Sequence, residues 1–323
     1  AALKNDNTAI FFGRFHQTDD SLNKPPDIEI IGTNVKKIIP NSKDFAMIHN
    51  DGSASFYRSK DSTSKYIYAY EEVKDKLKNG VINIFPGHNS FVAIKDNGEV
   101  ISWGDIEPPH VYEGTENLNG NNIEHIYSTY GAFAALNKDG TVIPWGHAIR
   151  KKREFYETEE QYNNFYYSRG TYRYLPPDNL INIVSIVATG SYARHSERQA
   201  FAGLTSDGKV LTWGDTEKGD TGEIGSILLE TDNQIATNKR DENDKNLIRG
   251  PLKDVKKIVS SQYGFAALKT DGSIVEWGAK QHNNTSTHQS QLKSNFTEIE
   301  STDTAFAGIK ADGSIYSWGS GSH

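Results

Sequence analysis

The 323-residue sequence contains no cysteine and no apolar run long enough to span a bilayer. The lack of cysteine excludes disulfide bridges, thiolate zinc sites and cysteine nucleophiles. The lack of an apolar run of about 18 residues excludes a membrane-spanning helix. A net charge of −7 argues against a generally basic nucleic-acid-binding protein, so we consider nucleic acid an unfavoured partner.

Recognisable enzyme motifs are missing as well. There is no Gly-x-Ser-x-Gly elbow and no His-Glu-x-x-His motif. The stretch from Gly203 to Lys209 begins like a phosphate-binding loop, but Val210 replaces the required hydroxyl and the stretch spans a repeat hairpin. Residues 241–246 gather oxygen ligands without the ordered spacing and glycine of a calcium loop. We therefore expect no enzymatic activity, no catalytic residue, no cofactor and no metal site.

What the sequence does contain is an internal repeat. Residues 265–278 read Phe-Ala-Ala-Leu-Lys-Thr-Asp-Gly-Ser-Ile-Val-Glu-Trp-Gly, and related copies begin at Phe306, Phe201, Phe133, Phe91 and Phe45. A seventh copy, without its first residue, opens the chain at Ala1. Each later copy follows an apolar stretch of the form Val-x-x-Ile, at Val35–Ile38, Val81–Ile84, Ile123–Ile126, Ile183–Ile186, Val255–Ile258 and Phe296–Ile299. The first copy has no such stretch, so we expect either a removed preceding segment or a short first unit.

The repeat predicts strands joined by tight turns. Apolar residues alternate with a period of two on both sides of an Asp-Gly or Asn-Gly pair, which is Asp6-Asn7 in the first copy. These pairs tolerate positive φ at both positions, as a tight hairpin requires. Copies are spaced 41 to 46 residues apart in most steps, and 68 and 64 residues in two. This period predicts an all-β fold, a seven-bladed β-propeller with three- to four-stranded blades and two long loop insertions.

All five tryptophans occupy one repeat position: Trp103, Trp145, Trp213, Trp277 and Trp318. Tyr57 and Phe12 stand there in the two degenerate copies. A ring of aromatic binding sites would explain this pattern, but we favour packing between blades, because the position also carries Phe and keeps the phase of the strand.

The pattern Phe-Ala-Ala-Leu-Lys-x-Asp-Gly-x-Val-x-x-Trp-Gly resembles the repeats of the regulator of chromosome condensation family. That family forms seven-bladed propellers, and the short repeats are similar to its bacterial branch, which includes a secreted propeller inhibitor of β-lactamase. The family's Gly-x-x-His is not kept: Gly87 to Phe91 reads Gly-His-Asn-Ser-Phe, and Ser128 to Phe133 reads Ser-Thr-Tyr-Gly-Ala-Phe. The family's guanine-nucleotide exchange role is therefore assigned to no residue here.

The two long steps contain insertions, which on repeat scaffolds usually mark a binding face. The first, residues 147–182, holds six of the 16 tyrosines, and its residues 150–161 fit a short charged helix. Tyr and Arg dominate the hot spots of protein interfaces. We therefore predict the partner-binding residues Arg150, Arg153, Tyr156, Tyr162, Tyr166, Tyr167, Arg169, Tyr172, Arg173 and Tyr174. A self-packed loop that covers the propeller edge remains the alternative.

The second insertion, residues 215–253, is acidic. Residues 215–254 contain ten acidic and six basic residues, a net charge of −4, whereas residues 147–174 contain six basic and four acidic residues, a net charge of +2. Its apolar cluster at Ile224, Ile227, Leu228, Leu229 and Ile235 fits a docked helix or hairpin, or a partner-binding patch. Both insertions follow a Trp-Gly pair in consecutive units, so we expect them side by side on one face.

These observations predict one domain at residues 1–319, with residues 320–323 as a tag or linker remnant. We expect a non-enzymatic, monomeric propeller that binds a protein through loops on one face. Absent cysteine and abundant Lys, Asn and Ile favour a secreted or delivered bacterial protein with a virulence or toxin-associated role. Two alternatives stay open: an effector that acts on a host small GTPase as a nucleotide-exchange-like protein, and a carbohydrate-binding propeller.

Overall fold

The computed structural model describes residues 1–13, 27–41, 44–58, 67–88, 90–104, 118–129, 132–146, 171–174, 180–189, 200–217, 252–262, 264–278 and 291–319. The chain divides into two compact units, Ala1–Ser128 and Thr129–His323. The expectation of one domain at residues 1–319 stays a prediction.

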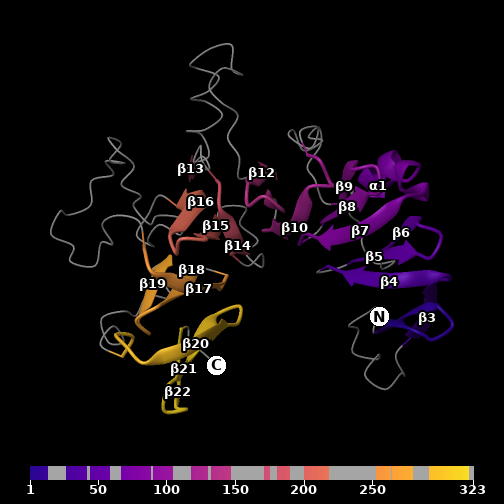
Figure 1. Cartoon of the computed structure of the whole chain (residues 1–323). Helices are drawn as coiled ribbons and strands as arrows, with labels where there is room; N and C mark the ends of the chain where they lie inside the picture. Colours follow the sequence, from indigo (N-terminus) through magenta and orange to yellow (C-terminus); the bar gives the residue numbers. More distant parts are fainter. Residues whose placement is uncertain are drawn as a thin grey trace, which may run out of the picture. The chain divides into compact units, whose positions relative to one another are not determined.

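The described residues form almost only strands (Figure 1). In the first unit these are β1 (Ala2–Leu3), β2 (Ala9–Gly13), β3 (Asp27–Gly32), β4 (Val35–Pro40), β5 (Asp44–His49), β6 (Ala54–Arg58), β7 (Val81–Pro86), β8 (Ser90–Lys95), β9 (Val100–Gly104) and β10 (Ile123–Ser128). The same unit contains helix α1 (Ile67–Val73) and the 3-10 helix η2 (Lys76–Lys78).

The second unit consists of strands in its described part. They are β11 (Ala132–Asn137), β12 (Val142–Gly146), β13 (Thr171–Tyr174), β14 (Ile183–Ala188), β15 (Ala200–Thr205), β16 (Val210–Glu217), β17 (Val255–Ser260), β18 (Gly264–Lys269), β19 (Ile274–Gly278), β20 (Phe296–Ser301), β21 (Ala305–Lys310) and β22 (Ile315–Gly319).

These strands form seven small sheets, which we number as blades 1 to 7 in chain order. The strand orders are β1-β2-β3, β4-β5-β6, β7-β8-β9, β10-β11-β12, β13-β16-β15-β14, β17-β18-β19 and β20-β21-β22. The predicted fold class, an all-β propeller of seven blades with three to four strands each, is confirmed. Every Val-x-x-Ile stretch lies in the strand that directly precedes the repeat hairpin, and blade 1, which has none, adds β3 beside β2 instead.

The hairpin turns are where predicted but differ in type. Positive φ occurs at the second residue of the pair, as at Gly52 (φ 78°) and Gly272 (φ 78°), and at Asn7 (φ 63°) in blade 1. The Gly52 amide donates to the His49 carbonyl, so the loop has three residues and not two. Aspartate serves a different purpose: Oδ1 of Asp51 accepts the backbone N–H and the hydroxyl of Ser53. The predicted requirement for positive φ at both positions was wrong, because a side-chain hydrogen bond selects Asp.

Several of the turns also bond to the next blade. The Gly52 carbonyl accepts the amide of Val81, the first residue of β7, at 2.8 Å. The same contact joins Gly208 to Val255 at 2.9 Å and Gly272 to Phe296 at 3.0 Å. These three turns are therefore held both by their own sheet and by the following sheet.

The five tryptophans pack inside the protein. Their exposures are 0% for Trp103, Trp145 and Trp213, 5% for Trp277 and 6% for Trp318. Each indole stacks on the phenylalanine opposite it in the same blade, with ring centroids 5.2 to 5.8 Å apart. All five are buried, and packing between blades is confirmed for Trp103, Trp277 and Trp318, which cluster with residues of a neighbouring blade. Phe12, at the same repeat position in blade 1, is 49% exposed.

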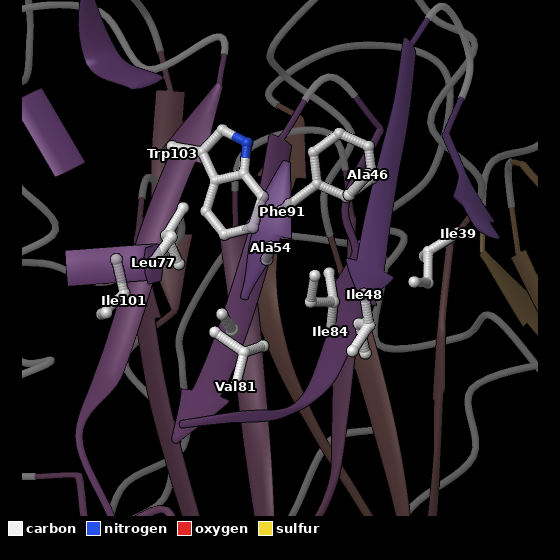
Figure 2. Close-up of a cluster of buried hydrophobic side chains, with 11 residues drawn as sticks. Ile39, Ala46, Ile48, Ala54, Leu77, Val81, Ile84, Phe91, Ile101 and Trp103 are labelled. Atoms are coloured by element: carbon white, nitrogen blue, oxygen red, sulfur yellow. The ribbon is translucent and has the colours of Figure 1, made fainter. Parts of the chain in front are cut away.

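Adjacent blades share these cores. Figure 2 shows the Phe91 and Trp103 rings of blade 3 within a cluster that also takes Ala46 and Ile48 from blade 2. Leu77 of η2 is fully buried in this cluster, and Tyr70 of α1 packs against it. The sequence analysis missed α1, although Tyr70, Val73 and Leu77 follow the three-to-four-residue spacing of an apolar helix face.

Candidate partner-binding surface

Seven of the ten predicted binding residues lie outside the described residues: Arg150, Arg153, Tyr156, Tyr162, Tyr166, Tyr167 and Arg169. The charged helix proposed for residues 150–161 and the apolar cluster at 224–235 lie outside them as well. The other three, Tyr172, Arg173 and Tyr174, form most of strand β13.

Strand β13 connects the two insertions. It comes from the end of the first insertion and pairs antiparallel with the end of β16, whose last three residues begin the second. Thr171 stands opposite Glu217, Tyr172 opposite Thr216, Arg173 opposite Asp215 and Tyr174 opposite Gly214. The two insertions therefore leave the blade from neighbouring strands. The register of this pairing could not be predicted from sequence, because β13 and β16 are far apart along the chain.

The base of this surface is joined to the core of the blade. Strand β16 has eight residues, whereas β9, β12, β19 and β22 have five each. Its first half is anchored in the core: Val210 and Trp213 have no exposed surface, and Trp213 stacks on Phe201 at 5.4 Å. The edge strand β13 is thus held by a strand that belongs to the core.

Residues of opposite charge stand opposite each other in the backbone register of this pairing, Arg173 in β13 and Asp215 in β16. They belong to the segments 147–174 and 215–254, whose net charges are +2 and −4 respectively. Segments of opposite charge that meet at paired strands can orient a charged partner.

The remaining candidate motifs show little chemistry. Gly203 to Lys209 is the hairpin between β15 and β16, as the repeat predicted: Thr205 and Lys209 pair through their backbones at 2.9 Å, and Gly208 has φ 79°. Among the described residues, no group of three or more His, Asp or Glu side chains could hold a metal ion. No helix in that part of the chain has the length and apolarity that crossing a bilayer requires.

One half-buried acid stands apart from this pattern. Glu276 of β19 accepts a hydrogen bond from the indole Nε1 of Trp318 in β22. Burial raises the pKa of its carboxyl to about 7, although the hydrogen bond from Trp318 acts in the opposite direction. The sequence analysis did not single out Glu276, but its place before Trp277 is a visible signal, because Ser, Pro or Thr precedes the other tryptophans.

These features define a seven-bladed β-propeller whose repeats resemble those of the regulator of chromosome condensation family. No protein-family model matches the chain, and no curated protein sequence matches it. Among solved structures it is similar to Prp20p of Saccharomyces cerevisiae, with 14% identity, 88% of this chain and 71% of that chain covered, and a TM-score of 0.43. It is also similar to the CRINKLY WD40 ectodomain of the Arabidopsis thaliana receptor kinase ACR4, with 12% identity, 89% of this chain and 80% of that chain covered, and a TM-score of 0.39. Likenesses of this strength indicate neither a ligand nor a partner.

Proposed function

We propose that the chain is a non-enzymatic, protein-binding propeller that holds its partner at the two insertions. The observation that carries this proposal is the pairing of β13 with β16, which joins the end of the tyrosine-rich insertion to the start of the acidic one. A blade anchored by Trp213 supplies a fixed base, and the insertions supply the variable surface.

The composition of the insertions supports a protein as the partner. Tyrosine and arginine contribute large contact area and directional hydrogen bonds, and both are enriched at interface hot spots. The adjoining positive and negative segments favour a partner with complementary charges, since such an arrangement sets the orientation of the encounter.

A combined Tyr166, Tyr167, Arg169 and Tyr172 to alanine variant tests the proposal. We expect it to keep its thermal midpoint and to lose affinity for the partner identified by pull-down, measured by calorimetry with the purified partner. The matched control replaces three side chains away from the insertions, Lys36, Glu72 and Ile315, with alanine. Unchanged affinity in the first variant, or collapse of its fold, would make the first insertion a structural cover.

The proposal extends to origin and role. We propose a secreted or delivered bacterial factor associated with virulence or a toxin, similar to the bacterial branch of the family; the absent cysteine and the Lys, Asn and Ile content support this. Recovery of the native protein only from the cytosol of its source would contradict it. The family resemblance also supports a nucleotide-exchange-like effector, which nucleotide release from purified small GTPases tests. A glycan array tests the carbohydrate-binding alternative.

A further inference from the structure

Blades 6 and 7 pack through an apolar interface that contains one acidic side chain. Ala266, Leu268 and Ile274 of blade 6 cluster with Phe296, Ile299, Phe306 and Trp318 of blade 7. Glu276 follows Ile274 by two residues in β19 and so shares its face of the sheet. The residues at the same repeat position are Ser102, Pro144, Thr212 and Ser317, none of which carries a charge.

The hydrogen bond of Glu276 is also exceptional within the repeat. The indole nitrogens of Trp103, Trp145, Trp213 and Trp277 are buried without a hydrogen-bond partner in the described structure. Trp318 differs because its indole N–H donates to Oε1 of Glu276. Since the two residues belong to different blades, this bond crosses the interface between β19 and β22.

The charged and titratable groups around Glu276 do not neutralise it. Tyr316 of β22 faces it, and burial followed by the charge of Glu276 raises the pKa of the Tyr316 hydroxyl. The Lys310 ammonium of β21 lies over the rings of Phe296 and Tyr316, at 5.2 and 5.7 Å from their centroids. On the first strands, the Lys257 ammonium is engaged at 2.7 and 2.6 Å by Glu298 and Glu300.

We propose that Glu276 makes the joint between blades 6 and 7 pH-sensitive, closed when its carboxyl is protonated and loosened when the carboxyl ionises. An ionised carboxylate within apolar packing loses hydration that the single indole N–H does not replace. Separation of β22 from β19 would let water reach the carboxylate. Strand β22 stands last in the strand order of blade 7, so its opening breaks one ladder only.

The direction of the effect follows from the pKa of the closed and the opened joint. The pKa of the carboxyl is about 7 when the joint is closed, against an ordinary pKa of 4.5 for an exposed glutamate. The closed form therefore binds the proton more tightly, and its advantage is full below pH 4.5 and lost as pH rises toward 7. Between pH 5 and 8 the opening equilibrium of β22 should increase by up to roughly 70-fold.

Two measurements test this joint on the whole protein. Amide exchange, expressed as protection factors, should show weaker protection of β22 at pH 8 than at pH 5. The indole resonance of Trp318 should titrate with a midpoint near 7 in heteronuclear NMR. The Glu276→Gln variant keeps an acceptor for the indole and removes the charge, so both pH effects should disappear. The control, Glu300→Gln, removes an exposed carboxylate of blade 7 and should leave both effects in place.

A second variant separates the proposed joint from general electrostatics. Trp318→Phe removes the hydrogen bond that lowers the pKa of Glu276, so the pH at which β22 loses protection should rise. An indole resonance that is constant from pH 5 to 8 would overturn the proposal. So would equal pH dependence of protection in the native protein and in Glu276→Gln.

Discussion

Truncation of Trp277 to alanine should cost more stability than any change confined to the surface. The side chain is 5% exposed and stacks on Phe265, with centroids 5.2 Å apart. It also packs against Ala200, Ala202 and Val210 of the preceding blade. The substitution therefore opens a cavity between two blades and not within one.

The magnitude follows from apolar burial. A buried tryptophan removes about 200 Å² from water, worth about 5 kcal/mol at about 25 cal/mol per Å². Alanine retains a small part of that area, while the cavity adds a further cost, so the net loss should be about 3–5 kcal/mol. The indole nitrogen of Trp277 has no hydrogen-bond partner in the described structure, and no polar contact therefore contributes to this value.

Urea unfolding followed by far-UV circular dichroism measures the loss, with the Trp277→Phe variant as the control that keeps an aromatic ring. The slope of the free energy against urea should stay constant for the comparison to hold. A loss below about 1 kcal/mol, with partner binding impaired, would refute the packing role and return Trp277 to the candidate binding residues.

Two further predictions concern turns and edges. Gly272→Ala should destabilise the protein more than Gly313→Ala in the same urea assay. Both substitutions cost about 1–2 kcal/mol because the backbone has positive φ. A Cβ at Gly272 would also meet the backbone nitrogen of Asn295 and the backbone oxygen of Phe296 at 3.1 Å, whereas the space around Gly313 is open. Equal losses of unfolding free energy in the two variants would show that the backbone of the next blade shifts to make room for the added Cβ. Among strands, amide exchange should be fastest in Ala1–Gly13 and Tyr316–Gly319, because β1 has two residues and lacks a Val-x-x-Ile partner. Uniform protection of all second and third strands would contradict this.

The repeat could be predicted because its signals are local. Asp271-Gly272 fixes a turn, the alternation around it fixes two strands, and Trp277 marks the buried face; each signal lies within fourteen residues. The same pattern recurs seven times along the chain, and this recurrence makes a weak local signal reliable. The turn type was not predicted correctly, because two different causes favour Asp at the same position. One is tolerance of positive φ, and the other is a carboxylate that accepts a backbone hydrogen bond, as Asp51 does from Ser53.

The features that escaped depend on distant contacts. Tyr172 pairs with Thr216, although the strands β14 and β15 lie between them along the chain. The four residues of β13 carry no register signal of their own. The pKa of Glu276 depends on Trp318 and on packing from blade 7, neither of which is near it in sequence. Helix α1 did have a local signal in Tyr70, Val73 and Leu77, which the strand repeat around it obscured.

The bond between turns such as that of Gly208 and the next blade bears on where this scaffold tolerates extra length. Residues added at an Asp-Gly turn would displace the Gly208 carbonyl from the Val255 amide and so disturb two sheets together. Residues added after a Trp-Gly pair follow the third strand of the repeat and disturb no such bond. Both long insertions of this chain occur at the second kind of place, after Gly146 and Gly214. A foreign epitope or enzyme grafted onto this protein should therefore be accepted after a third strand, such as at Gly104, and rejected at the turns.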